Sequence, residues 1–388
     1  MIVRESYLTK IRPFIGKDVI KVLTGLRRTG KSVLLGQILN EINSKNTIFI
    51  NFEDLGNRHL CEYNALHDYV CQRIGNKKNK FYLFFDEIQE VDGWEKAINS
   101  LRVKFSADIY ITGSSSRLLS GELSTYIAGR YVSFVVYPFS FTEFKIANAD
   151  HTFDDYLKYG GMPFLPSIGF ESEISKKYLQ DVFNSVVLKD IVKRNKIRDV
   201  DLLERIIHYA LANVGKCFSA TSISKFFKAE KRIVAPETIL NYLRACEEAF
   251  LLYRLKSQDI NGKKILKVSE KYYVVDHGLR EAVVGENLKN SEIVLENIVA
   301  LELLRRGYKV SVGRAGDTEV DFVAEKDGEK LYLQVCYLLD NETTVKRELR
   351  SLLEIRDNYP KFVLYKTGSF SGNVAGIVAK DVEVWLTE

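Results

Sequence analysis

The first 145 residues alternate short apolar runs with segments of helical periodicity. Four of the runs are predicted to be strands, and they are Val19–Thr24, Thr47–Phe52, Phe81–Phe85 and Asp108–Thr112. The third run is apolar throughout, which is typical of a parallel strand covered on both faces. Val33–Ile42 follows the first run and has apolar residues at helical spacing. The pattern predicts an α/β fold built on a parallel sheet.

Residues 146–200 have helical periodicity, with apolar positions three and four apart in Tyr178–Arg194, and they predict a helical lid and connector. After them the pattern changes to three helices followed by two strands. These are Leu202–Ala212, Ser219–Phe227, Pro236–Phe250, Leu251–Leu255 and Tyr272–Val275. This order resembles a winged helix, which we assign to residues 201–278.

Residues 279–388 are predicted to form a smaller α/β domain. Its expected elements are the helix Ser291–Arg306, the strands Lys309–Val312, Glu319–Ala324 and Leu331–Tyr337, the helix Thr344–Asn358 and the strand Lys361–Tyr365. This order is similar to the restriction-endonuclease-like core. The sequence therefore predicts four parts, with boundaries after residues 145, 200 and 278.

A glycine-bounded loop, Gly25–Ser32, joins the first strand to its helix. Gly25 and Gly30 let the backbone N–H groups turn inward, and the helix start adds its positive dipole end. Lys31 would reach the β- and γ-phosphates of ATP, and the Ser32 hydroxyl would bind Mg²⁺. The residues expected to contact the nucleotide here are Gly25, Arg28, Thr29, Gly30, Lys31, Ser32 and Val33.

Polar residues follow the third and fourth strands. Asp86 and Glu87 end the third strand, where Asp86 is expected in the Mg²⁺ shell and Glu87 beside the attacking water. The fourth strand leads into a serine run, in which Ser114 or Ser115 is expected to sense the γ-phosphate. Together these residues predict an ATPase site at one edge of the sheet.

Two arginines come next, and a guanidinium that reaches a neighbouring subunit's γ-phosphate would stabilise the transition state. Arg130 is the first choice for this role and Arg117 the second. At this point the segments Thr112–Ser120, Gly129–Arg130 and Tyr137–Phe144 resemble a large prokaryotic family of AAA+-type ATPases. The ATPase core of that family is similar to the branch that holds origin-recognition and STAND ATPases.

The run Tyr159–Pro163 adds to this resemblance, which covers nearly the whole chain. In that branch a Gly-x-Pro motif lies in the lid and approaches the base and ribose of the nucleotide. The resemblance therefore implies that Gly161 and Pro163 border the site. A helix end followed by a turn would place the same residues there for structural reasons alone.

The third helix of the winged-helix segment would be the one that reads DNA. Its expected outward positions include three acids, Glu237, Glu247 and Glu248, which would repel phosphate. The basic residues lie before this helix and on the wing, and they are Lys225, Lys228, Lys231, Arg232, Lys263, Lys264 and Lys267. Three roles of the winged-helix segment therefore stay open: recognition of a DNA sequence, contact with the DNA backbone and contact with protein.

The nuclease-like segment carries an incomplete metal motif. The candidate ligands of this vestigial site are Glu296, Asp321 and Gln334. Cys336 stands where active nucleases of the restriction-endonuclease-like superfamily carry a lysine. A thiol does not replace an ammonium in activating water. Lys330 or Lys346 could supply the missing charge. We expect a nuclease fold retained for binding or as a scaffold.

The composition is that of an ordinary globular protein and does not identify a function. The chain is 46% hydrophobic and 28% charged, and its net charge of +5 permits nucleic acid as a partner without requiring it. The five cysteines show no short-spaced pair and predict reduced thiols in the cytoplasm. No run approaches the roughly 18 apolar residues of a membrane span, so no membrane partner is expected.

The leading hypothesis is an AAA+-type ATPase that uses ATP and Mg²⁺ to move its C-terminal domains. Two alternatives stay open. One is a nucleotide-gated switch that hydrolyses ATP slowly, and the other is an ATP-gated, metal-dependent DNA nuclease. DNA, protein clients and further copies of the chain are the candidate partners.

Overall fold

The computed structural model describes residues 2–119, 129–147, 149–260, 265–315, 317–340, 342–368 and 372–388. The chain divides into two compact units. The first comprises Met1–Tyr137 with Glu248–Phe250, and the second comprises Pro138–Glu247 with Leu251–Glu388. Within the described ranges no helix is both long and apolar enough to cross a membrane.

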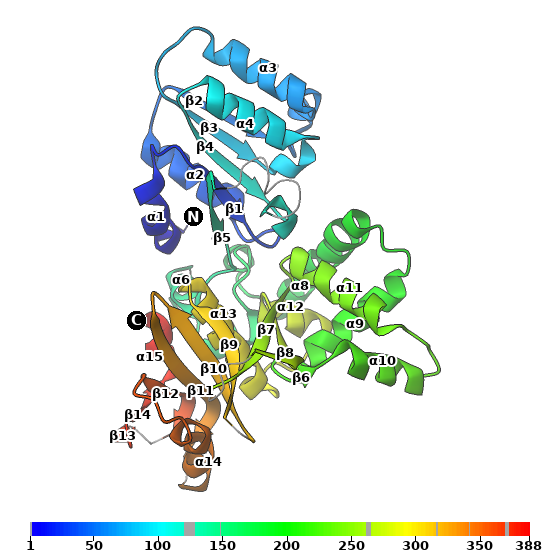
Figure 1. Ribbon diagram of the computed structural model, residues 1–388, viewed down its shortest axis with the longest axis vertical. Coiled ribbons are helices and arrows are strands. Elements are labelled where there is room, and N and C mark those ends of the chain that lie inside the picture. The colour runs from blue at the N-terminus through cyan, green and yellow to red at the C-terminus, as the bar shows by residue number, and fades with distance from the viewer. Residues whose placement is uncertain are drawn as a thin grey trace. The chain divides into compact units, whose positions relative to one another are not determined.

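The first unit is built on a parallel five-stranded sheet in the order β2-β3-β4-β1-β5 (Figure 1). Its strands are β1 Ile20–Thr24, β2 Thr47–Asn51, β3 Phe81–Asp86, β4 Ala107–Gly113 and β5 Tyr131–Val135. The four predicted strands and the parallel sheet are confirmed. The sequence did not predict β5, because this edge strand is only half-buried and Ser133 interrupts its apolar residues.

Helices cover both faces of this sheet, and they are α1 Glu5–Ile11, α2 Lys31–Ile42, α3 Tyr63–Ile74 and α4 Trp94–Lys104. Successive side chains of a strand point to opposite faces. Leu83 and Phe85 of β3 therefore pack with residues of α3 and α4, whereas Phe84 packs with residues of α1 and α2. Burial on both faces explains why these strands are apolar runs without alternation.

The second unit contains ten α-helices among its described residues. These are α6 Phe141–Ala147, α7 Phe153–Tyr159, α8 Ser172–Ser185 with its π-helical continuation Val186–Lys193, α9 Val200–Ala212, α10 Ala220–Ala229, α11 Pro236–Glu248, α12 His277–Val283, α13 Ser291–Arg305, α14 Glu342–Leu353 and α15 Val382–Thr387. Each predicted helix after residue 200 is present, with bounds shifted by a few residues. Ser219 begins α10 with a capping box, in which its side chain and that of Ser222 each accept the other residue's backbone N–H.

A nine-stranded sheet runs through the second unit in the order β13-β14-β12-β11-β10-β9-β7-β8-β6 (Figure 1). Its strands are β6 Cys217–Phe218, β7 Leu252–Asp259, β8 Ile265–Val274, β9 Lys309–Ala315, β10 Thr318–Lys326, β11 Glu329–Leu339, β12 Lys361–Gly368, β13 Gly372–Val374 and β14 Ile377–Asp381. Backbone pairing between Ser257–Asp259 and Val312–Arg314 joins β7 to β9. The strands of the predicted wing thus share one sheet with the strands of the predicted nuclease-like core, which the sequence did not anticipate.

Helix α11 presents fewer acids to solvent than the sequence suggested. Glu247 is half-buried and pairs with Arg254 at 3.2 Å, and burial raises the pKa of its carboxyl. Glu237 is exposed near the start of the helix, whereas Glu248 is half-buried at its end. The expectation of an outward acid was therefore wrong for Glu247, because the position on the helix alone did not reveal the arginine on the adjoining strand.

Candidate functional site

The loop between β1 and α2 lies at the carboxyl edge of the first sheet. A Cβ at Gly25 would lie 2.3 Å from the carbonyl oxygen of Val136, and Gly30 has a φ of +88°. Glycine avoids the first contact and adopts the second conformation without strain. The side chains of Arg28 and Val33 are exposed. The first-turn N–H groups of α2 have no intrahelical partner, which makes this helix start suited to an anion.

Lys31 lies in the first turn of α2, with only 3% of its side chain exposed. Its ammonium donates hydrogen bonds to the carbonyl oxygens of Gly25 at 3.1 Å and Leu26 at 2.9 Å. It also lies 3.8 Å from Glu87 Oε1. Lys31 therefore bridges the loop and the acidic end of β3, which is where a phosphate held by the loop would need a counter-charge.

Asp86 is buried at the end of β3. Its Oδ1 accepts a hydrogen bond from the Thr112 hydroxyl at 2.6 Å. Burial raises the pKa of Asp86, and the neighbouring hydroxyls of Thr112 and Ser32 oppose the rise. Its Oδ2 is buried and has no hydrogen-bond partner among the residues that the structure describes. A carboxylate oxygen left unpaired beside a hydroxyl is a donor set that fits Mg²⁺ or its bound water.

Glu87 has a left-handed backbone with a φ of +53°, which is uncommon for a residue other than glycine. Its N–H donates to Thr112 Oγ1 at 2.9 Å, and the Gln89 side chain donates to Glu87 Oε2. Pairing of Phe85 with Ile111 sets Thr112 beside Asp86 in the sheet. One hydroxyl therefore positions both acids. The sequence analysis missed Thr112 and Gln89, although the place of Thr112 at the end of β4 was a usable signal.

Arg4 is a third residue that the sequence analysis missed. It is buried behind the loop, where its guanidinium donates to the carbonyl oxygens of Thr29 and Tyr137, each at 3.0 Å. The guanidinium also lies 4.7 Å from the centre of the Tyr7 ring, and the Tyr7 hydroxyl accepts the N–H of Tyr137. The carbonyl and N–H of a trans peptide point in opposite directions. Holding the Thr29 carbonyl from behind thus turns the N–H of Gly30 toward the opposite side.

The serine and arginine candidates of the first unit do not all lie at the carboxyl edge of the sheet. Ser114 and Ser115 are buried just beyond β4. Arg130 precedes β5, its carbonyl accepts the N–H of Ile20 at 2.8 Å, and its guanidinium donates to Asn99. Because β1 and β5 are parallel, Arg130 lies at the amino edge of the sheet, opposite to its own loop. Its assigned role in a neighbouring subunit stays a prediction, and the side chain of Arg117 lies outside the described residues.

Gly161 and Pro163 belong to the second unit. The N–H of Gly161 donates to Asp276 Oδ2 at 2.7 Å, and a Cβ at Gly161 would lie 2.2 Å from the Phe139 carbonyl oxygen. Gly160 is equally confined by Asp276. This packing requires the two glycines for structural reasons. Contact of Gly161 or Pro163 with a nucleotide stays a prediction.

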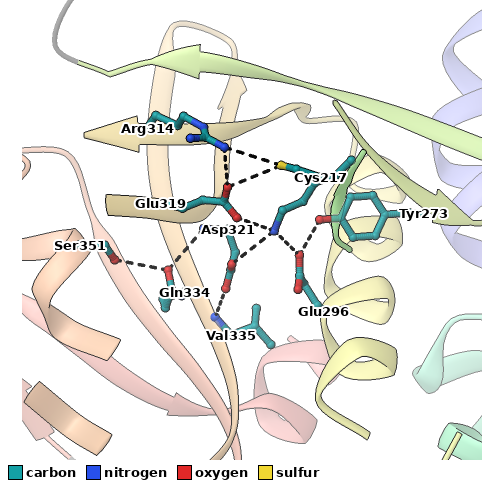
Figure 2. Close-up of polar contacts among 10 residues, drawn as sticks. Cys217, Tyr273, Glu296, Arg314, Glu319, Asp321, Gln334, Val335 and Ser351 are labelled. Carbon is teal, nitrogen blue, oxygen red and sulfur yellow. Dashed lines mark hydrogen bonds and ion pairs between the residues drawn. The ribbon is translucent and has the colours of Figure 1, made fainter. Parts of the chain in front are cut away.

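A cluster of charged residues lies between α13, β8 and β10 in the second unit. Figure 2 shows Glu296, Glu319 and Asp321 converging on one ammonium group, which belongs to Lys271. Gln334 lies beside them, and its Oε1 accepts the N–H of Asp321 at 3.3 Å. The structure thus brings Glu296, Asp321 and Gln334 into one region, and their role as metal ligands stays a prediction.

The cation of this cluster, however, is not one of the two that the sequence suggested. Lys330 pairs with Glu325 at 3.2 Å and lies over the ring of Tyr359. Lys271 comes from β8, in the segment assigned to the wing, and no local pattern connected it with the acids. Across the described ranges, no group of three or more His, Cys, Asp or Glu side chains is arranged to hold a metal ion.

Known families match two parts of the chain. Residues 17–145 match a family described as an AAA domain, and residues 150–290 match a domain of unknown function, DUF8612. Among solved structures, the Aeropyrum pernix ORC1 protein in complex with DNA matches with a TM-score of 0.33 and 11% identity, over 75% of this chain and 94% of that chain. AMPPCP-bound DnaA from Aquifex aeolicus matches with a TM-score of 0.32 and 15% identity, over 64% and 90%. At TM-scores of this size, no property of these two proteins is transferred to the chain.

Two relatives match over most of their length. An uncharacterized protein of Haemophilus influenzae is 38% identical over 403 residues, which span 100% of this chain and 99% of that protein. An uncharacterized protein of Methanocaldococcus jannaschii is 34% identical over 353 residues, which span 86% and 77%. The chain therefore belongs to the same family as these two proteins, and its residues 17–145 form an AAA domain.

Proposed function

We propose that the first unit binds ATP with Mg²⁺ and hydrolyses it. The observation that carries the proposal is the unpaired, buried Oδ2 of Asp86, which lies on the same carboxyl that Thr112 holds. Leaving such an atom without a partner costs about 1–3 kcal/mol, a cost that a bound cation would remove. Lys31 and the start of α2 supply the matching site for phosphate.

Each residue would have a distinct role. The loop N–H groups and Lys31 would hold and neutralise the phosphates, and Ser32 and Asp86 would hold the metal. Mg²⁺, when bound, supplies further neutralisation of phosphate charge. Glu87 would accept a proton from the attacking water, and Gln89 would orient its carboxylate. Lys31 would have to leave the carbonyl groups of its own loop to reach the nucleotide.

Hydrolysis would be coupled to rearrangement of the second unit. The order of α9, β6, α10, α11, β7 and β8 supports a winged helix there, and α13 with β9–β12 supports a nuclease-like core. The pairing of Glu247 with Arg254 removes one of the acids that argued against DNA contact by α11. DNA and protein both remain candidate partners for this unit. Arg130 would act on a neighbouring copy, because it lies at the edge of the sheet opposite to its own loop.

Replacing Glu87 by glutamine tests the proposed chemistry. The amide keeps the shape of the side chain but cannot accept the proton, so ATP binding should persist while turnover falls by about 100-fold or more. Binding would be measured by titration with a fluorescent ATP analogue, and turnover by phosphate release. Glu90→Gln is the matched control, because it is the same change at an exposed position of the same turn.

The outcomes separate the alternatives. Full turnover by the Glu87→Gln variant would show that another group handles the water. If the wild type binds ATP but releases no phosphate, with or without single-stranded, duplex or branched DNA, the chain is a nucleotide-gated switch. Absence of binding by the wild type would remove both proposals.

A further inference from the structure

The charged cluster of the second unit consists of Glu296, Glu319 and Asp321 around Lys271. The Lys271 ammonium lies 2.9 Å from Glu296 Oε1, 2.8 Å from Glu319 Oε1 and 3.8 Å from Asp321 Oδ1. Only 4% of the Lys271 side chain is exposed. An ammonium has three N–H donors and no acceptor, and the distances to Glu296 and Glu319 suit hydrogen bonds, whereas Asp321 at 3.8 Å adds an ionic attraction.

Strand geometry explains why the ammonium reaches this point. Lys271 and Tyr273 are two residues apart on β8 and therefore point to the same face. Both contact Glu296, since the Tyr273 hydroxyl donates to Glu296 Oε1 at 2.6 Å (Figure 2). Lys271 pairs with Leu255, in the part of β7 that precedes its pairing with β9. Lys271 therefore links β8 to α13 and β10 by ion pairs, whereas β8 and β10 are not hydrogen-bonded neighbours in the sheet.

Asp321 and Glu319 also have partners other than Lys271. Asp321 Oδ2 accepts the N–H of Val335 at 2.9 Å, and Arg314 lies 3.5 Å from Glu319 Oε2. In the part of the chain that the structure describes, no buried oxygen of the three acids lacks a hydrogen-bond partner. The contrast with Asp86 lies in burial, because Asp86 has a fully buried oxygen without a hydrogen-bond partner, whereas the described acids of the cluster have none.

We infer that Lys271 is the resident cation of this cluster and takes the place of a divalent metal, so that the second unit holds its strands together here and does not cut nucleic acid. Acids at 2.8–2.9 Å from a nitrogen are spaced for N–H···O bonds, whereas Mg²⁺ needs oxygen ligands at about 2.0–2.1 Å. A metal would also have to displace an ammonium that is covalently attached to the chain. That ammonium would then be left buried without its partners. This inference is independent of ATP hydrolysis by the first unit.

The test compares Mn²⁺ binding by four forms of the full chain. These are the wild type, Asp321→Asn, Lys271→Met and the double variant Lys271→Met/Asp321→Asn. Mn²⁺ alone would be titrated and the free ion followed by electron paramagnetic resonance. Any Mn²⁺ held by the first unit is common to all four forms, so it cancels in the differences. Lys256→Met is the matched control, because Lys256 is exposed on β7.

The wild type and Asp321→Asn should give the same Mn²⁺ titration. Lys271→Met should gain one site per chain that the double variant lacks. At this site, Lys271→Met should bind Mn²⁺ about tenfold or more tightly than the wild type does, since a change of about 1.4 kcal/mol in binding free energy is sufficient for a factor of ten. Lys256→Met should behave as the wild type.

Two results would overturn the inference. One is a wild-type Mn²⁺ site, or Mn²⁺-dependent cleavage of DNA by the wild type, that Asp321→Asn removes. The other is a Lys271→Met protein that is folded by circular dichroism and gains no site. If Lys271→Met does not fold, the comparison of the wild type with Asp321→Asn still decides, because equal titrations and no Asp321-dependent cleavage support the inference.

Discussion

Thr112→Val tests how the two acids of the proposed ATP site are held in place. Valine has nearly the shape of threonine but no hydroxyl, so the change removes polar contacts and leaves the packing of β4 almost unaltered. The hydroxyl donates to Asp86 Oδ1 at 2.6 Å and accepts the N–H of Glu87 at 2.9 Å. Both contacts are buried, so water does not replace them.

The size of the effect follows from these two contacts. A hydrogen bond to a charged group contributes about 1.5–3 kcal/mol, and one between neutral groups contributes about 0.5–1.5 kcal/mol. Their loss should lower the free energy of unfolding of the first unit by about 2–4 kcal/mol. At about 2–4 °C per kcal/mol for a unit of this size, the unfolding midpoint should fall by about 5–15 °C. Turnover should fall by about 100-fold, because displacement of a reacting group by about 1 Å has an effect of that order.

The two tryptophans allow each unit to be followed separately. Trp94 is buried in α4 of the first unit, and Trp385 lies in α15 of the second. In a Trp385→Phe background, fluorescence reports unfolding of the first unit, and phosphate release reports turnover. Thr112→Ser is the matched control, because it keeps the hydroxyl and loses one methyl group.

Serine should therefore retain most of the turnover and lose about 1 kcal/mol of stability. The reasoning is refuted if valine turns over ATP at the wild-type rate. It is equally refuted if serine and valine are impaired to the same extent, because the methyl group and not the hydroxyl would then matter.

Two further predictions concern the support of each site. Arg4→Ala leaves the buried carbonyl groups of Thr29 and Tyr137 unpaired, so the unfolding free energy should fall by about 2–4 kcal/mol. ATP titration should also show weaker binding, with partial recovery in Arg4→Lys, and unchanged affinity would contradict the role of Arg4. Burial and the neighbouring Glu296 raise the pKa of Asp321 well above its ordinary value of 3.8, so the folded protein keeps a proton that the unfolded chain has already released. The unfolding free energy of the second unit should therefore fall as pH rises from 3.8 toward the raised pKa of Asp321 in the folded protein. Asp321→Asn should show a smaller slope of unfolding free energy against pH, measured by Trp385 fluorescence in a Trp94→Phe background.

The fold of the first unit was largely predictable because its signals are local. Strands buried on both faces, such as β3, are continuous apolar runs, and a loop that curls as tightly as Gly25–Ser32 needs glycine at fixed positions. The half-buried edge strand β5 has neither signal, so it escaped prediction. The same limit applied to the nine-stranded sheet, because β7 pairs with β9 through residues that are 55 positions apart, such as Ser257 and Val312, and neither segment carries a mark of its partner.

The sequence by itself determined the loop Gly25–Ser32, the carboxylates Asp86 and Glu87, and most of the helices and strands, since each depends on residues close together in the chain. The tertiary structure decided which groups meet these residues. Register between β3 and β4 set Thr112 against Asp86, and the path of β8 carried Lys271 to acids from α13 and β10. Side chains brought together by distant elements have no fixed spacing in the sequence, so their contacts, charges and unpaired atoms are defined only when the chain is folded.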